Sequence, residues 1–238
     1  MRRIAAALGL TVTLFADTAA ADAATVGTDR ACYLETRSTN VTVNGTGFAA
    51  ARPYSVALDG TPLPGGGAAT DANGAMQGTI SPPTLTAAQH ERIYTVGVES
   101  DGVAANTTFT VTKFSADFAP SARVAPDSRV RFSVYGFGLS SPNPQVFLHY
   151  IDPTGRMRAT VRLGRARGQC GSIDRTARRK LFPFGVPRRG RWQLQFDTSR
   201  TYTRGKKGSP FLFYTIGVNV RAQTSATPRT TAGSLGVG

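Results

Sequence analysis

Short runs of alternating apolar and polar residues, each ended by a turn signal, fill most of the chain. In the N-terminal half the predicted strands are Val41–Val43, Tyr54–Leu58, Ala75–Ile80, Tyr94–Glu99 and Thr107–Val111. Asp-Gly and Asn-Gly pairs between them suit tight hairpin turns, because these residues accept a positive φ. Thr86–Glu91 alone predicts one helical turn, with Gln89 placed to complete a capping box. The pattern predicts an all-β fold.

The C-terminal half repeats this plan. Val41–Phe48 and Val130–Phe137 both read as an alternating strand that ends in Gly-Phe. The further predicted strands are Gln145–Tyr150, Arg156–Leu163, Lys180–Phe184, Trp192–Phe196 and Phe211–Val220. A repeat of about 90 residues is the size of one small β-sandwich. We expect two tandem sandwich domains, over residues 26–112 and 113–222, and a disordered tail over 223–238.

Several motifs resemble those of a known family. Val-Thr-Val-Asn-Gly-Thr-Gly-Phe at 41–48 is followed by a Tyr-Ser-Val-Ala-Leu-Asp-Gly hairpin at 54–60, then by Tyr-Thr-Val-Gly-Val at 94–98. These motifs resemble the bacterial immunoglobulin-like repeats of the TIG type, found in secreted and cell-surface proteins. The resemblance covers most of residues 31–111 and, more loosely, 113–221. It implies immunoglobulin-like β-sandwiches that act as spacer, adhesion or polysaccharide-binding modules and carry no catalytic residues.

The first 23 residues are predicted to be a secretory signal peptide. Arg2 and Arg3 precede an apolar stretch over Ile4–Ala16, and Ala21-Asp22-Ala23 has the small-residue pattern of a cleavage site. The apolar stretch is shorter than the roughly 20 residues of a transmembrane helix. A buried N-terminal helix is the alternative interpretation. We expect a secreted or cell-surface protein without a transmembrane segment.

Cys32 and Cys170 are the only cysteines. An even number of cysteines in an exported protein favours a disulfide, which here would join the two predicted domains. In the chain-entropy model so long a loop contributes about 5 kcal/mol to stability. Two buried free thiols are the alternative, because cysteine also behaves as a small apolar residue.

Charge is distributed unevenly along the chain. Residues 113–238 contain 22 of the 28 Lys and Arg but only five of the 14 Asp and Glu. Residues 24–112 contain four Arg and seven acidic residues. This step indicates that the second domain faces something anionic. The alternative is a solvated outer face in a protein with a general bias toward arginine.

The strand predicted over Arg156–Leu163 places arginines on one face. The residues predicted to face inward are Met157, Ala159, Val161 and Leu163. The outward positions advance by about 6.6 Å per pair of residues, a regular row that suits phosphates or carboxylates along an extended polymer. Further basic clusters flank Leu181–Phe184 and occupy a loop with Arg200, Arg204, Lys206 and Lys207. The predicted anion-binding residues are Arg156, Arg158, Arg162, Arg178, Arg179, Arg188 and Arg189.

Residues suited to catalysis are scarce. His90 and His149 have no further metal-ligating residues at suitable spacing, and no serine has a G-x-S-x-G setting. Asp152 and Asp174 are expected at turns and Asp197 at a strand end. We therefore predict no enzyme, no metal site and no cofactor.

These observations favour a non-catalytic binding or adhesion module, secreted or associated with the cell envelope. Its second domain would contact an anionic envelope polymer, an acidic polysaccharide or lipid headgroups, and nucleic acid would bind only non-specifically. The alternative is a structural module for neutral carbohydrate or protein, with the loop Phe137–Pro144 as its site and incidental basic charge. An enzyme whose site is assembled only in space is the third hypothesis.

Overall fold

The chain folds as all-β immunoglobulin-like sandwiches. The computed structural model describes residues 23–35, 40–64, 68–120 and 125–221. Within these ranges the regular elements are β-strands and one short 3-10 helix, η1 (Phe137–Leu139). The predicted tail, and the predicted signal peptide apart from residue 23, lie outside the described residues. The all-β prediction is confirmed.

The first sandwich encloses a core between two sheets. The smaller sheet has the order β1-β3-β6, with bounds Thr25–Thr28, Val41–Thr46 and Met76–Ile80. The larger has the order β2-β8-β7-β4-β5, with bounds Cys32–Leu34, Val103–Thr112, Glu91–Ser100, Tyr54–Leu58 and Thr61–Pro62. Alternate residues face inward, so Val41, Val43, Val96 and Val98 are buried.

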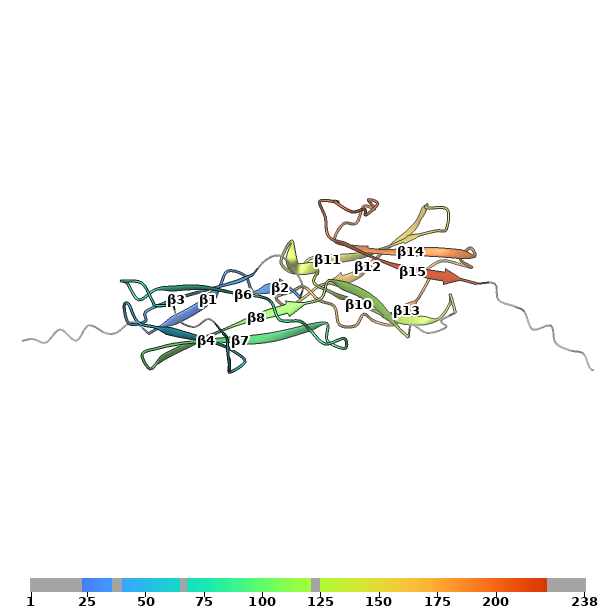
Figure 1. The fold of residues 1–238 in the computed structure, drawn as a ribbon. Coiled ribbons are helices and arrows are strands. Elements are labelled where there is room, and N and C mark those ends of the chain that lie inside the picture. The colour runs from blue at the N-terminus through green and yellow to red at the C-terminus, as the bar shows by residue number, and fades with distance from the viewer. Residues whose placement is uncertain (1–22, 36–39, 65–67, 121–124, 222–238) are drawn as a thin grey trace, which may run out of the picture.

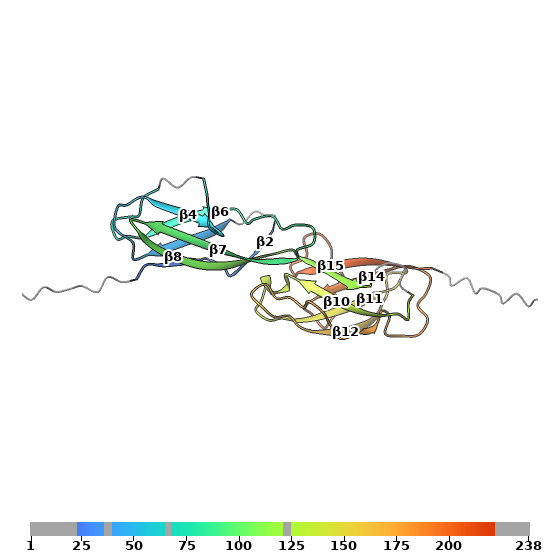
Figure 2. The same ribbon diagram turned by 90° about the horizontal axis from the view of Figure 1, so that it is seen from below.

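The second sandwich has its own core. One sheet has the order β13-β10-β9, with bounds Arg179–Lys180, Arg129–Tyr135 and Ser115–Ala119. The other has the order β12-β11-β14-β15, with bounds Met157–Arg165, Gln145–Ile151, Gly190–Asp197 and Phe213–Val220. Trp192, Leu194 and Phe196 alternate into this core, as predicted. The two sandwiches lie end to end (Figures 1 and 2).

The predicted repeat has a direct structural counterpart. β3 and β10 are equivalent strands, and each is followed by a glycine with φ 80°, Gly47 or Gly136. A left-handed φ is accessible to glycine without strain, so the chain can turn there and bury the next residue. That residue is Phe48 or Phe137, and both are buried. The domain limits at 112 and 113 stay predictions.

A disulfide joins the two sandwiches. Cys32 of β2 is bonded to Cys170, which follows β12, and their Cα atoms are 5.2 Å apart. Polar contacts surround it: Thr110 Oγ1 donates to Gln169 Oε1 at 2.7 Å, and Ser172 Oγ donates to Glu91 Oε2 at 2.5 Å. The predicted bond is therefore present, and the free-thiol alternative is wrong.

Two predicted elements differ from the structure. The strand predicted over Lys180–Phe184 ends at Lys180, because Pro183 has no N–H and Gly185 favours an irregular path. Phe182 is nevertheless buried in the core. Thr86–Glu91 does not form a turn of helix. The Gln89 N–H donates to the Thr86 carbonyl at 3.1 Å in a single turn, and β7 already begins at Glu91.

Candidate anion-binding surface

β12 carries the predicted arginine row, and two bulges interrupt it. Ala159 and Val161 pack on the core, opposite Tyr150 and Leu148. The register then shifts between Tyr150 and Ile151, so Met157 pairs with Ile151 and Arg158 is left at a bulge. As a result Met157 is 45% exposed, with its sulfur 3.9 Å from Thr160 Oγ1. The prediction that Met157 faces the core is therefore wrong.

Arg162 lies on the outer face of this sheet and is held in place there. It pairs with Phe147, and its Nε donates to Gln145 Oε1 at 2.8 Å. The Gln145 amide in turn donates to the Gly164 carbonyl, which fixes the glutamine across β11 and β12. Among the described residues neither Nη group of Arg162 has a hydrogen-bond partner. Because the guanidinium is already oriented, little further side-chain entropy is lost when a ligand binds to it.

Arg179 has a different environment from the other predicted arginines. It is half-buried on β13, and its Nη1 donates to the Arg162 carbonyl at 3.0 Å, so it links the edges of the two sheets. Burial raises the pKa of the neighbouring Tyr150 hydroxyl, and the Arg179 charge opposes that shift. Arg156, Arg158, Arg178, Arg188 and Arg189 are exposed.

A buried polar cluster lies under the basic loop that contains Arg200, Arg204, Lys206 and Lys207. His149 is fully buried on the outer face of β11, with Nδ1 2.8 Å from Thr160 Oγ1. Its Nε2 lies 3.1 Å from both Asp197 Oδ1 and the Ser199 carbonyl. Both partners are acceptors, so Nε2 donates. The sequence pattern predicted Asp197 at a strand end but gave no sign of its pairing with His149.

Gln195 extends this cluster into the loop 198–212. Its Nε2 donates to Asp197 Oδ2 and to the Thr203 carbonyl, both at 2.8 Å. Its Oε1 accepts the Gly205 N–H at 3.0 Å. These bonds hold the loop against the sheet, so the main chain that carries its exposed cations is held in place. Those cations are Arg200, Arg204, Lys206 and Lys207.

The structure thereby regroups the basic residues. His149 contacts both Thr160 of β12 and Ser199 of the loop, so the arginines of strand and loop share one side of the sheet. Arg191 joins them on β14, with its guanidinium lying across Gly217. We call this set the outer basic face; it consists of Arg162, Arg191, Arg200 and Arg204, together with Arg158, which is exposed at the bulge of β12. Arg188 and Arg189 lie instead on the segment that leads into β14, away from this face.

Counter-charges are placed differently in the two sandwiches. Among the described residues, every arginine–carboxylate ion pair belongs to the first sandwich: Arg30–Asp29, Arg52–Asp101 and Arg92–Asp59. In the second sandwich Asp117 and Asp152 accept hydrogen bonds from the main chain, and Asp197 lies in the buried cluster. Asp152, for example, accepts hydrogen bonds from the Thr154 hydroxyl and from the amides of Thr154 and Arg156. Its pKa is lowered, first by that hydroxyl and also by the Arg158 charge.

The chain of Thr160, His149 and Asp197 has the residue types of a proton relay but not its setting. His149 is 0% and Asp197 1% exposed, and the loop covers both, so neither can touch a substrate. Across the described ranges no group of three or more His, Cys, Asp or Glu could hold a metal ion. In the same part of the chain, no helix is long and apolar enough to cross a membrane.

Comparisons with known proteins leave the family open. No family model and no curated protein matches the chain. Among solved structures, bovine butyrophilin aligns with a TM-score of 0.31 and 9% identity over 84% of this chain and 99% of its own. The three N-terminal domains of the bacteriophage RB49 Highly Immunogenic Outer Capsid protein align with a TM-score of 0.29 and 12% identity, over 74% of this chain and 62% of theirs. With scores this low, neither protein informs the function of this one.

Proposed function

We propose that the chain is an exported, non-catalytic binding module of TIG-like sandwiches that contacts anionic polymers through its outer basic face. The polymer is an envelope phosphopolymer or an acidic polysaccharide. The observation that carries this proposal is the missing counter-charge: the second sandwich holds a large excess of arginine, and its described arginines form no ion pair with a carboxylate. A merely solvating surface mixes both signs, as the first sandwich does.

The form of the face supports a polymer more than a compact anion. Its arginines come from β12, β14 and the loop 198–212, so they are spread over one side of a sheet instead of converging on one point. Guanidinium groups bind phosphates and carboxylates through paired donors, and Arg162 already has its guanidinium oriented by Gln145. A chain of repeating anions can engage several such groups at once.

The disulfide and the predicted signal peptide support the location. Disulfides persist in oxidising compartments and are rare in the cytosol. The Cys32–Cys170 bond therefore fits a protein that folds after export. We propose the extracellular space or the cell envelope as its place of action.

The test is binding to fluorescent polyphosphate over a range of NaCl concentrations. Each cation that contacts a phosphate contributes about 0.7 to 0.9 to the slope of log K against log salt. Replacing Arg158 and Arg162 by Gln should lower that slope by about 1.4 to 1.8 if both contact the polymer. The matched control replaces Arg52 and Arg92 by Gln, which removes the same charge from the first sandwich and should leave the slope almost unchanged.

Three results would contradict the proposal. Binding that does not change with salt would exclude a phosphate-dominated contact. Equal losses in the two double variants would make the effect one of net charge alone. Binding of a neutral glycan with no effect of either substitution would favour the alternative, a module whose site is the loop Phe137–Pro144. The first part of that loop is not free, however, because Phe137 is buried and the Gly138 N–H donates to the Cys170 carbonyl at 2.8 Å.

A further inference from the structure

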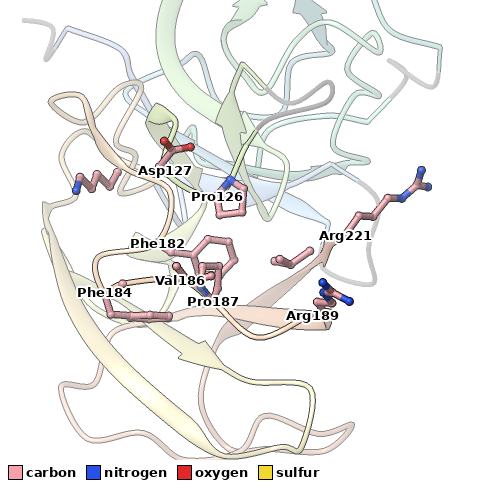
Figure 3. Close-up of a pocket in the computed structure, with 11 residues that line it drawn as sticks. Pro126, Asp127, Phe182, Phe184, Val186, Pro187, Arg189 and Arg221 are labelled. Carbon is pink, nitrogen blue, oxygen red and sulfur yellow. The ribbon is translucent and has the colours of Figure 1, made fainter. Parts of the chain in front are cut away.

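The second sandwich ends in a pocket that is separate from the outer basic face. Its volume is about 540 Å³, within the roughly 300–1,000 Å³ typical of small-molecule sites. The residues that line it come from 126–127, from the segment 180–189 and from the end of β15 (Figure 3). We call it the basal pocket, because the end of β15, which contributes to its lining, lies at the end of this sandwich that points away from the first (Figure 1).

The interior of the basal pocket is apolar. Phe182 and Phe184 lie against Trp192, with ring centroids 5.1 and 5.3 Å apart, so the core fixes both rings from behind. Val186 is 99% exposed beside them. Covering an exposed valine next to aromatic rings with an apolar group is favourable, because it removes apolar surface from water.

The rim of the pocket is charged unequally. Arg189 and Arg221 lie on one side, and Asp127 lies on the other (Figure 3). Lys180 also lines the pocket, so three cations face one acid. Among the described residues none of the four forms an ion pair. Two arginines on the same side of the rim both attract an anionic group that enters the pocket.

Backbone hydrogen bonds form the pocket in advance of any ligand. The Leu181 N–H donates to the Ser128 carbonyl at 2.8 Å, and the Phe182 N–H donates to the Pro126 carbonyl at 3.3 Å. At the other end of the segment, Trp192 Nε1 donates to the Arg188 carbonyl at 2.8 Å. A preformed site spends little of its binding free energy on ordering itself.

We propose that the basal pocket binds a small amphiphilic anion. Its apolar chain or ring contacts Phe184 and Val186, and its carboxylate or phosphate lies between Arg189 and Arg221. This activity does not depend on the outer basic face, so either site can be present without the other.

Isothermal titration calorimetry with decanoate tests the chemistry. One decanoate should bind per chain, and octanoate should bind more weakly by about fourfold per methylene, the ratio that corresponds to about 0.8 kcal/mol. Decyltrimethylammonium, which has the same chain and the opposite charge, should bind at least tenfold more weakly than decanoate. Equal binding of the two charges would overturn the proposal, as would the absence of decanoate binding.

Two variants locate the site. Replacing Arg189 and Arg221 by Gln should weaken decanoate binding at least tenfold, whereas replacing Arg158 and Arg162 by Gln, which removes the same charge, should change it less than twofold. Val186→Ser should lower the affinity for decanoate more than for octanoate, and because Val186 is exposed the melting temperature should stay unchanged. Equal losses in the two arginine pairs would place the ligand elsewhere and overturn the assignment.

Discussion

At the scale of single residues, most acids of the second sandwich accept hydrogen bonds from its main chain. Asp152 follows β11 and accepts three hydrogen bonds from the turn after it, two from main-chain amides and one from the Thr154 hydroxyl. A carboxylate used in this way stabilises a turn but is not available to pair with an arginine at the surface. Local capping of this kind occupies three of the five acids of the domain, Asp117, Asp152 and Asp197.

The lowered pKa of Asp152 predicts an acid-dependent part of the stability. Its folded pKa lies below the ordinary value of 3.8, so folding favours the ionised form. This contribution is complete above about pH 4 and is lost as the pH falls through the folded pKa. Asp152→Asn should lower the melting temperature at pH 7, and the difference from wild type should shrink toward pH 3. Circular dichroism melts measure it, and a difference that stays constant with pH would contradict the prediction.

The alternating pattern predicted the surface of β12 only in part. Alternation along Arg156–Leu163 correctly placed Ala159, Val161 and Leu163 toward the core. It failed at Met157, because a bulge depends on the partner strand and leaves no mark in the strand that contains it. The His149–Asp197 contact was equally out of reach, since it joins strands that pair only after the fold has formed.

At the scale of elements, the loop 198–212 is the part of the site that depends most on buried polar groups. Gln195 is only 3% exposed, although it faces away from the core, and it makes three hydrogen bonds to the cluster and the loop. The neighbouring outward residue, Gln193, is exposed. The alternating pattern gives these two glutamines the same role, and only the fold of the loop separates them.

Gln195→Ala should release the loop. The Gly205 amide would lose its acceptor and Asp197 a donor, and unsatisfied buried partners cost about 1–3 kcal/mol each. We expect faster hydrogen exchange at residues 199–209 and a lower melting temperature. Gln193→Ala on the same strand is the matched control and should change neither. Similar exchange in the two variants would show that the cluster does not hold the loop.

At the scale of the whole molecule, the net charge changes from the first sandwich to the second, and the disulfide crosses the junction between them. The sequence pattern predicted two sandwich units, because period-two alternation and the repeated Gly-Phe strand end are local signals, and the even cysteine count predicted the bond between them. The contacts around the bond involve residues far apart in the chain, such as the stack of His90 on Tyr135 at 4.5 Å, and no local pattern announces them.

The disulfide should couple the unfolding of the two sandwiches. It closes a loop of 138 residues, for which the chain-entropy model gives about 5 kcal/mol. Without it, the polar contacts near Thr110 and Ser172 and the His90–Tyr135 stack remain, and partly exposed contacts of this kind contribute little each. Replacing both cysteines by Ala should split one calorimetric unfolding transition into two.

The uncompensated charge causes repulsion within the second sandwich alone. The temperature of its transition should therefore be the one that rises with added salt. A single transition at the wild-type temperature would show that the junction holds without the bond.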